Sequence, residues 1–319
     1  DQAAMLAKQK FAQYVRAGVA AYQDGNHDRA LSLFEKGLLI ASEESQFSQY
    51  IEKLHFYARE SAFSLGRMDK ALEHARKLAK IYQNSAPRSL ERAKSLLSLG
   101  LILSRMERFE QAIAGLQQAV DIMRDLQLGP EQVQALAELG AVLENATNYD
   151  QALSNFQKAA ALSDKLQAPE LRAEQYMHIG RILDLRLSQY ARAKQKYARA
   201  EEIFGKLDKT GRMAQAILDQ ARCSRLLGNF ADAEKDLQTA LELASGVDDA
   251  QLLAKINMEK ANNAWFQARY QQAFTILNQV LQQARQKDWQ LMEVMARNTL
   301  GLTWWTLGDN DRAVRELNR

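Results

Sequence analysis

The chain has 319 residues, of which 47% are hydrophobic and 25% charged, and its formal net charge is +3. This composition is too apolar and too weakly charged for an intrinsically disordered protein. Only three Pro and fifteen Gly are present, so the chain lacks the frequent turn-forming residues of a β-sandwich or β-barrel.

A four-residue motif recurs along the whole chain: an aromatic or apolar residue, two polar residues and an alanine. Clear copies occupy residues 109–112, 149–152, 190–193, 230–233 and 270–273. The anchor alanines, which close the motif, follow each other at steps of 41, 41, 40, 41, 40, 40 and 40 residues: Ala30, Ala71, Ala112, Ala152, Ala193, Ala233, Ala273 and Ala313. Eight copies in register at this spacing indicate an internal repeat.

Within each repeat the apolar residues have the 3.6-residue period of a helix. In the fourth repeat, Leu136 and Leu143 mark one helix face and Phe156 marks the next, with a polar break at 145–148 between them. Each repeat is therefore predicted to be two antiparallel helices joined by a short turn. Three prolines fit this phase because each precedes a first helix, where a missing N–H costs nothing: Pro87, Pro130 and Pro169.

A small residue stands twelve or thirteen residues before most anchor alanines, and a large residue stands four residues after them. The small residues are Gly18, Gly100, Gly140, Gly180, Ala221, Ala261 and Gly301; the large ones are Phe34, Leu116, Phe156, Tyr197, Leu237, Leu277 and Leu317. We expect the small residue to face the anchor alanine, which lets the two helix axes approach closely. The second repeat departs from the pattern, with Arg59 at the small position and Ala75 at the large one. The fifth has one extra residue in 184–189, which predicts a longer turn.

These positions, in this order, resemble the signature of the tetratricopeptide repeat (TPR) family, in its variants with repeats longer than 34 residues. The resemblance covers residues 11–319. It implies an all-α fold: a right-handed superhelical α-solenoid of about eight antiparallel helix-turn-helix repeats, forming one domain over residues 1–319. The last repeat breaks off at Arg319 and the chain does not begin with Met. We therefore expect this sequence to be a fragment of a longer protein.

The family geometry implies that first helices line a concave groove, with side chains one and four positions beyond the small residue facing it. Arg and Asn there can pair with carboxylates or backbone amides, and aromatic residues can anchor apolar side chains. Tyr22 and Phe63 occupy equivalent positions, but we expect them to pack sideways against neighbouring repeats. The residues expected to contact a partner are Arg181, Arg222, Arg225, Asn262, Trp265, Asn298 and Trp305.

The favoured function is a protein–protein interaction scaffold that binds a protein or peptide with acidic and apolar side chains. One alternative is the regulatory or sensor array of a larger effector: a caspase-like protease, a cyclase or kinase, or a transcription regulator. The sequence beyond Arg319 would separate the two. A third possibility is a nucleic-acid-binding scaffold, which the sequence pI of 8.8 allows. It ranks lower because the basic cluster around Arg192–Arg199 is diluted by Gln, Tyr and Ala.

Catalytic motifs are absent from the sequence, which has no glycine-rich phosphate loop, HExxH pair, paired CxxC or GxSxG elbow. The four histidines (27, 55, 74 and 178) are scattered, and we expect them to be solvated or packed rather than metal-bound. Cys223, the single cysteine, excludes a disulfide framework and is expected to be a small buried hydrophobe. We therefore expect no enzyme activity, cofactor, metal site or membrane insertion, and the cytoplasm is the default location.

Overall fold

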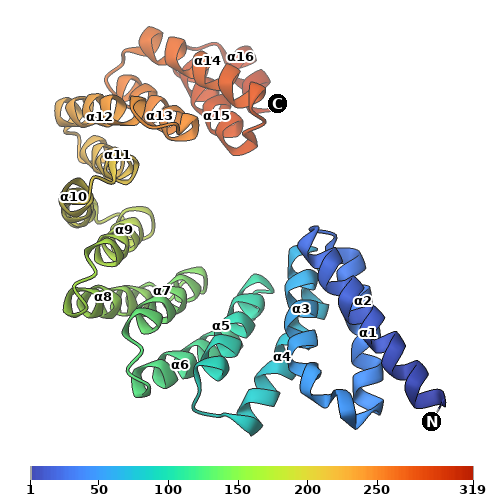
Figure 1. The fold of residues 1–319 in the computed structure, drawn as a ribbon. Helices are drawn as coiled ribbons and strands as arrows, with labels where there is room; N and C mark the ends of the chain where they lie inside the picture. Colours follow the sequence, from blue (N-terminus) through green and yellow to red (C-terminus); the bar gives the residue numbers. More distant parts are fainter. Residues whose placement is uncertain (1, 319) are drawn as a thin grey trace. The chain divides into compact units, whose positions relative to one another are not determined.

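The computed structural model describes residues 2–318, and every regular element within them is helical (Figure 1). The elements are α1 (Gln2–Gln23), α2 (His27–Glu43), the 3₁₀ helix η1 (Ser45–Tyr50), α3 (Ile51–Ser64), α4 (Met68–Ser85), α5 (Leu90–Arg105), α6 (Phe109–Asp125), α7 (Gly129–Asn145), α8 (Tyr149–Lys165), α9 (Pro169–Leu185), α10 (Tyr190–Lys206), α11 (Thr210–Leu226), α12 (Phe230–Ser245), α13 (Ala250–Phe266), α14 (Tyr270–Gln286), α15 (Gln290–Thr306) and α16 (Asn310–Leu317). Odd-numbered helices are the first helices of the eight repeats and even-numbered helices are the second. The predicted all-α solenoid of helix pairs is confirmed.

The turn inside every repeat contains one residue in the left-handed backbone region. It stands five residues before each anchor alanine, and it is glycine in only four repeats: Gly25, Gly66, Glu107, Thr147, Ser188, Gly228, Ala268 and Gly308, with φ between 52° and 83°. A left-handed residue reverses the chain directly after a helix. This regularity places every second helix in the same register relative to its first helix.

The predicted helix boundaries in the middle of the chain are confirmed. The polar break at 145–148 contains the end of α7, at Asn145, and the three-residue turn to α8. In the fifth repeat the turn between α9 and α10 has four residues, 186–189, so the extra residue lengthens the turn. Pro130 lies in the first turn of α7 and Pro169 begins α9, as their missing N–H groups allow.

At the recurring glycines the atoms nearest to an added Cβ belong to the large residue of the second helix, and at Gly301 the backbone oxygen of the anchor residue Ala313 follows at 3.4 Å. A methyl group added to Gly180 would lie 2.5 Å from Cε1 of Tyr197, and one added to Gly100 would lie 2.6 Å from Cγ of Leu116. Gly18, Gly140 and Gly301 meet Phe34, Phe156 and Leu317 in the same way. The large side chain therefore fills the space that the absent Cβ leaves, and the two residues act as a pair.

The second repeat exchanges the two partners of this pair. Arg59 takes the small position and is buried, while Ala75 takes the large position and is also buried. The guanidinium of Arg59 is held by Glu60, with Nε 3.0 Å from Oε1, and it lies 4.8 Å from the ring centroid of Phe56. The second repeat therefore carries its long side chain on the first helix and its small one on the second, and both are buried.

The helices group into two compact bodies, residues 1–162 and 163–319, which we call the N-terminal and C-terminal bodies. Each has its own apolar core between paired helices. In the C-terminal body that core includes Ala261, Leu277 and Leu300. The prediction of one domain over the whole chain remains a prediction. Among the described residues, none of the helices combines the length and apolar character needed to cross a membrane.

Candidate functional site

The predicted contact residues lie on the first helices of the last four repeats: α9, α11, α13 and α15. We call this surface the first-helix wall. It comprises Arg181 and Asp184 on α9, Arg222 and Arg225 on α11, Asn262 and Trp265 on α13, and Asn298, Leu302 and Trp305 on α15. All of these residues belong to the C-terminal body. Their environments differ sharply from one end of the wall to the other.

Two carboxylates hold Arg222. Its Nε donates a 2.9 Å hydrogen bond to Oδ2 of Asp184 on α9, and its Nη2 lies 3.1 Å from Oδ1 of Asp219 on α11. Both carboxylates are buried, and Asp184 is only 2% exposed. Burial alone would lower the pKa of Arg222, but Asp219 and Asp184 outweigh it and raise that pKa. Burial also raises the pKa of Asp219. This charged cluster joins the fifth repeat to the sixth.

A second polar chain joins α11 to α13 and α13 to α15. Arg225 is buried and pairs with Glu259, Nε to Oε1 at 2.5 Å, while its guanidinium lies 4.9 Å from the ring centroid of Phe266. The other oxygen of Glu259 accepts a 3.3 Å bond from Nδ2 of Asn262. The hydroxyl of Thr299 donates to Oδ1 of Asn262 at 3.5 Å. Arg225 and Asn262 therefore both connect neighbouring repeats.

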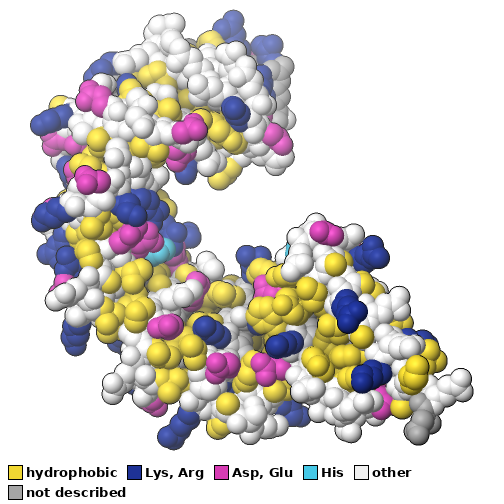
Figure 2. Space-filling model, in the orientation of Figure 1, with side chains coloured by type: hydrophobic (Ala, Val, Ile, Leu, Met, Phe, Trp, Pro, Cys, Tyr) yellow, Lys and Arg dark blue, Asp and Glu magenta, His cyan; other side chains and the backbone are white. Residues whose placement is uncertain are grey.

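Sequence reasoning found the arginines of the wall but missed their carboxylates. Asp219 and Glu259 each stand two residues before the small residue of their own first helix, and Asp184 stands four residues after Gly180. An acidic residue two positions before the small residue, repeated in the sixth and seventh repeats, was the signal that could have revealed Asp219 and Glu259. Figure 2 shows basic and acidic side chains mixed over α9–α11. The three arginines of the wall are thus accompanied by three buried carboxylates, Asp184, Asp219 and Glu259.

Arg181 is half-buried on α9, and its Nη2 lies 3.4 Å from Nδ1 of His178, one turn earlier. Trp265 is packed against the core of the C-terminal body, edge-on to Phe266 at 4.9 Å and to Tyr270 at 6.4 Å between ring centroids. Its Nε1–H is buried with no hydrogen-bond partner among the described residues. Trp265 therefore contributes mainly to packing, with one unsatisfied donor.

The far end of the wall has a different character. Asn298, Leu302 and Trp305 are spaced four and three residues apart on α15, so they lie along one face of that helix. All three are exposed, and Trp305 is 66% exposed. A tryptophan this open is unusual in a protein whose other large aromatic residues are mostly packed. This face combines an amide with two apolar side chains.

The remaining expectations can be checked individually. Tyr22 packs edge-on against Tyr57 of the next repeat at 5.2 Å, and Arg105 lies 4.3 Å from the ring centroid of Phe63, so both rings pack sideways as predicted. Cys223 is fully buried, and burial raises the pKa of its thiol to about 12. A thiol in that environment stays protonated and behaves as a small hydrophobe. No cluster of three or more potential metal ligands occurs among the described residues.

Comparison with known sequences identifies the repeat. Residues 60–125, which run from the end of α3 through α6, match the family model described as tetratricopeptide repeat. The match covers 66 of the 319 residues, so the tetratricopeptide repeat is identified in that part of the chain. No curated protein matches it at a significant level.

Solved structures share the fold of this chain at low sequence identity. The apo quorum sensor NprR from B. thuringiensis has a TM-score of 0.66 at 11% identity, with 97% of this chain and 85% of that one covered. A Rap protein complexed with competence and sporulation factor has a TM-score of 0.57 at 15% identity, with coverages of 99% and 96%. A signal-transduction ATPase with a tetratricopeptide repeat sensor, from Pyrococcus horikoshii, has a TM-score of 0.64 at 16% identity, with coverages of 97% and 52%. Such identities establish a shared fold and no more.

Proposed function

We propose that this protein is an interaction scaffold that binds a peptide segment of a partner along the first-helix wall. The contacts would come from the seven predicted residues: Arg181, Arg222, Arg225, Asn262, Trp265, Asn298 and Trp305. The observation that carries the proposal is the face of α15, where Asn298, Leu302 and Trp305 are exposed beside one another. Exposed tryptophans next to hydrogen-bonding side chains are typical of binding hot spots.

The pairing of the arginines bears on the chemistry of the partner. Arg222 and Arg225 already face Asp184, Asp219 and Glu259, so an acidic partner would have to compete with buried internal pairs. The exposed groups are instead an amide and two large apolar side chains. We therefore propose that apolar side chains of the partner dock on Leu302 and Trp305, while its backbone hydrogen-bonds to Asn298.

Proteins of the same fold offer support of a general kind. One similar structure is a Rap protein complexed with competence and sporulation factor, and another is described as a quorum sensor. Both descriptions agree with a helical-repeat protein that recognises a signal or a partner. The wall residues of this chain are the basis for extending that role to it.

The test uses the full chain and a phage-displayed library of random peptides. Peptides enriched on the wild-type chain should bind a Trp305→Ala/Asn298→Ala double variant at least tenfold more weakly, since loss of a hot-spot aromatic residue costs about 2 kcal/mol or more. Leu39→Ala is the matched control, because Leu39 is equally exposed, at 66%, but lies on α2. Equal binding by the double variant and the wild type would contradict the proposal.

A second candidate function is the sensor array of a larger effector. It is favoured by one observation: nearly the whole chain aligns with about half of a signal-transduction ATPase that has a tetratricopeptide repeat sensor. A sensor must change conformation when it binds its ligand. Small-angle scattering with and without an enriched peptide separates the two candidates. A ligand-dependent change in the radius of gyration supports the sensor, and an unchanged radius supports the simple scaffold.

A further inference from the structure

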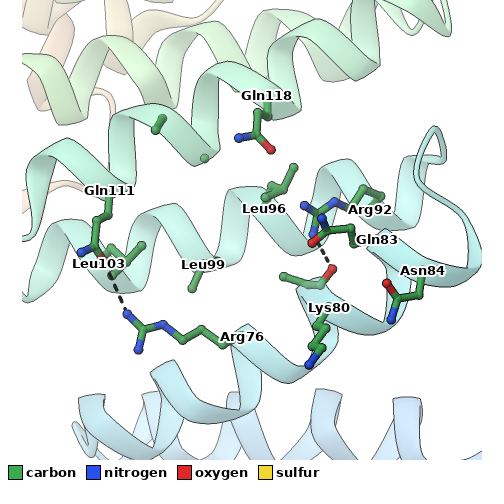
Figure 3. A pocket seen from close by; sticks show the side chains of 13 residues that line it. Arg76, Lys80, Gln83, Asn84, Arg92, Leu96, Leu99, Leu103, Gln111 and Gln118 are labelled. Carbon is green, nitrogen blue, oxygen red and sulfur yellow. Dashed lines mark hydrogen bonds between the residues drawn. The ribbon is translucent and has the colours of Figure 1, made fainter.

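The N-terminal body contains an open pocket of about 580 Å³ between α4, α5 and α6 (Figure 3). Its floor is a leucine stripe on α5, formed by Leu96, Leu99 and Leu103 at helical spacing. Leu96 and Leu103 are buried, while Leu99 is half-exposed in the middle. The two second helices, α4 and α6, supply the walls. The pocket is thus an apolar trough over one first helix.

A glycine explains why the trough occurs in this repeat. In each repeat two positions face each other. One is on the second helix, three residues after the anchor alanine, and the other is on the first helix, four residues before the small residue. In the last repeat these two positions hold Glu316 and Arg297, which form a 2.9 Å ion pair. In the third repeat they hold Gly115 and Leu96. A methyl group added to Gly115 would meet nothing closer than the backbone oxygen of Leu96 at 3.9 Å. The side chain that covers the first helix elsewhere is missing here.

The walls of the pocket are cationic. Arg76 and Lys80 on α4 and Arg92 on α5 line it, and no acidic side chain does. Arg92 is already engaged, because its Nη1 donates to the backbone oxygen of Ala79. Among the described residues, neither Arg76 nor Lys80 forms an ion pair, and Arg76 reaches only Oε1 of Gln111, across the trough on α6, at 3.4 Å. Two cations therefore line the pocket without a carboxylate partner.

Four side-chain amides complete the rim: Gln83 and Asn84 on α4, and Gln111 and Gln118 on α6. Figure 3 shows the first pair on one side of the leucine stripe and the second pair on the other. Amides on both sides can donate to and accept from the backbone of an extended peptide. Leu96 and Leu103 are seven positions apart on α5, about 10 Å at 1.5 Å per residue, a distance that three or four extended residues span.

We propose that this trough is a second peptide-binding site, separate from the first-helix wall, and that it takes a short extended segment in which acidic and aliphatic residues alternate. Successive side chains of an extended peptide point to opposite sides. Aliphatic side chains therefore lie on Leu99 and the floor around it, while carboxylates point up to the rim, within reach of Arg76 and Lys80. The absence of any acidic lining residue determines the sign of the partner's charge.

The test measures fluorescence polarisation of labelled peptides with the full chain. Glu-Leu-Glu-Leu-Glu is the probe, Gln-Leu-Gln-Leu-Gln lacks its charge and Glu-Ser-Glu-Ser-Glu lacks its aliphatic side chains. The probe should bind at least tenfold more tightly than either control peptide. An Arg76→Gln/Lys80→Gln variant and a Gly115→Leu variant should each weaken the probe at least tenfold. Gly115→Leu fills the trough with a good helix former, so it leaves the helical circular dichroism signal intact.

Two further variants make the outcome decisive. Lys94→Gln removes an exposed cation of α5 that does not line the pocket, and it should change the affinity less than twofold. Trp305→Ala/Asn298→Ala should also leave the probe's affinity unchanged, which separates this site from the first-helix wall. Equal binding of the probe and the uncharged peptide, unchanged binding to Gly115→Leu, or no binding at millimolar peptide would each overturn the proposal.

Discussion

Replacement of Arg222 by glutamine tests whether the middle of the first-helix wall is structural. The substitution removes the cation that pairs with both Asp184 and Asp219, and so takes a counter-charge from two buried carboxylates. Breaking a buried ion pair by removing one partner costs about 3–5 kcal/mol. Because the side chain of Arg222 is 26% exposed, solvent screens the cluster in part, and we expect a loss near the lower limit, about 3 kcal/mol.

The partner substitution should behave in the opposite way. Asp219→Asn removes one of two like charges and keeps the pair of Arg222 with Asp184, so we expect a change within about 1 kcal/mol. The pH dependence has a defined sign. Burial raises the pKa of Asp219, so the folded state binds the proton more readily than the unfolded state does. The deficit of Arg222→Gln is therefore largest at pH 7 and shrinks as the pH falls and the unpaired carboxylates become protonated.

Urea unfolding followed by far-ultraviolet circular dichroism at pH 7 and pH 5 measures both effects. If Arg222→Gln unfolds within about 0.5 kcal/mol of the wild type, the value expected of a surface arginine, the cluster is not a structural joint. A deficit that grows at pH 5 would equally refute the reasoning. The prediction also has a practical consequence: charge reversal at Arg222 confuses loss of binding with loss of folding, whereas Trp305→Ala does not.

Three more predictions concern the repeat itself. Gly180→Ala should destabilise the chain by about 1–3 kcal/mol despite the better helix propensity of alanine, because the new methyl meets the buried ring of Tyr197. Gly115→Ala, whose new methyl meets nothing closer than 3.9 Å, should instead raise the melting temperature. Similar shifts for both variants would contradict the pairing of glycine with the large residue. Ala268→Gly, at a φ of 57°, should stabilise the turn by about 0.5–1 kcal/mol in urea unfolding, and a loss of stability would mean that the turn is not left-handed. Burial and the neighbouring His74 lower the pKa of His55 to about 4, so the folded state resists protonation of this ring. The free energy of unfolding should therefore fall by on the order of 2 kcal/mol between pH 7 and pH 5. A His55→Leu variant should lack most of this pH dependence, and a pH profile identical to that of the wild type would exclude His55 as its source.

The fold could be predicted from the sequence because its signals are local and repeated. Helical periodicity, the anchor alanine and the polar break each appear several times in the same register, so chance matches average out. The same repetition located the longer turn in the fifth repeat. The left-handed turn residue was hidden for a physical reason. Four repeats use glycine there and four use other residues such as Thr147 and Ala268, and no single residue type marks the position.

The candidate site was less accessible because its character depends on contacts between repeats. A sequence shows that Arg222 and Arg225 lie on one helix, but their partners Asp184 and Glu259 lie 38 and 34 residues away. Whether an arginine is free or paired is decided by the packing of first helices, which periodicity alone does not specify. The histidine pair shows the same limit, because His55 and His74 are 19 residues apart and yet their Nδ1 atoms are 2.9 Å apart.

A repeat architecture allows binding sites of this kind because each structural position occurs once in every repeat, and different repeats can place different residues there. The two positions that face each other beside the small residue hold a histidine pair in the second repeat, glycine over leucine in the third and an ion pair in the last. Stability arises from the sum of many similar interfaces. One repeat can therefore leave its position open without unfolding the array. The trough that Arg76 and Lys80 line is a position of this kind, and the open face of α15 around Trp305 is another. We therefore expect binding residues at positions where one repeat differs from the others, and stabilising residues at positions where the repeats agree.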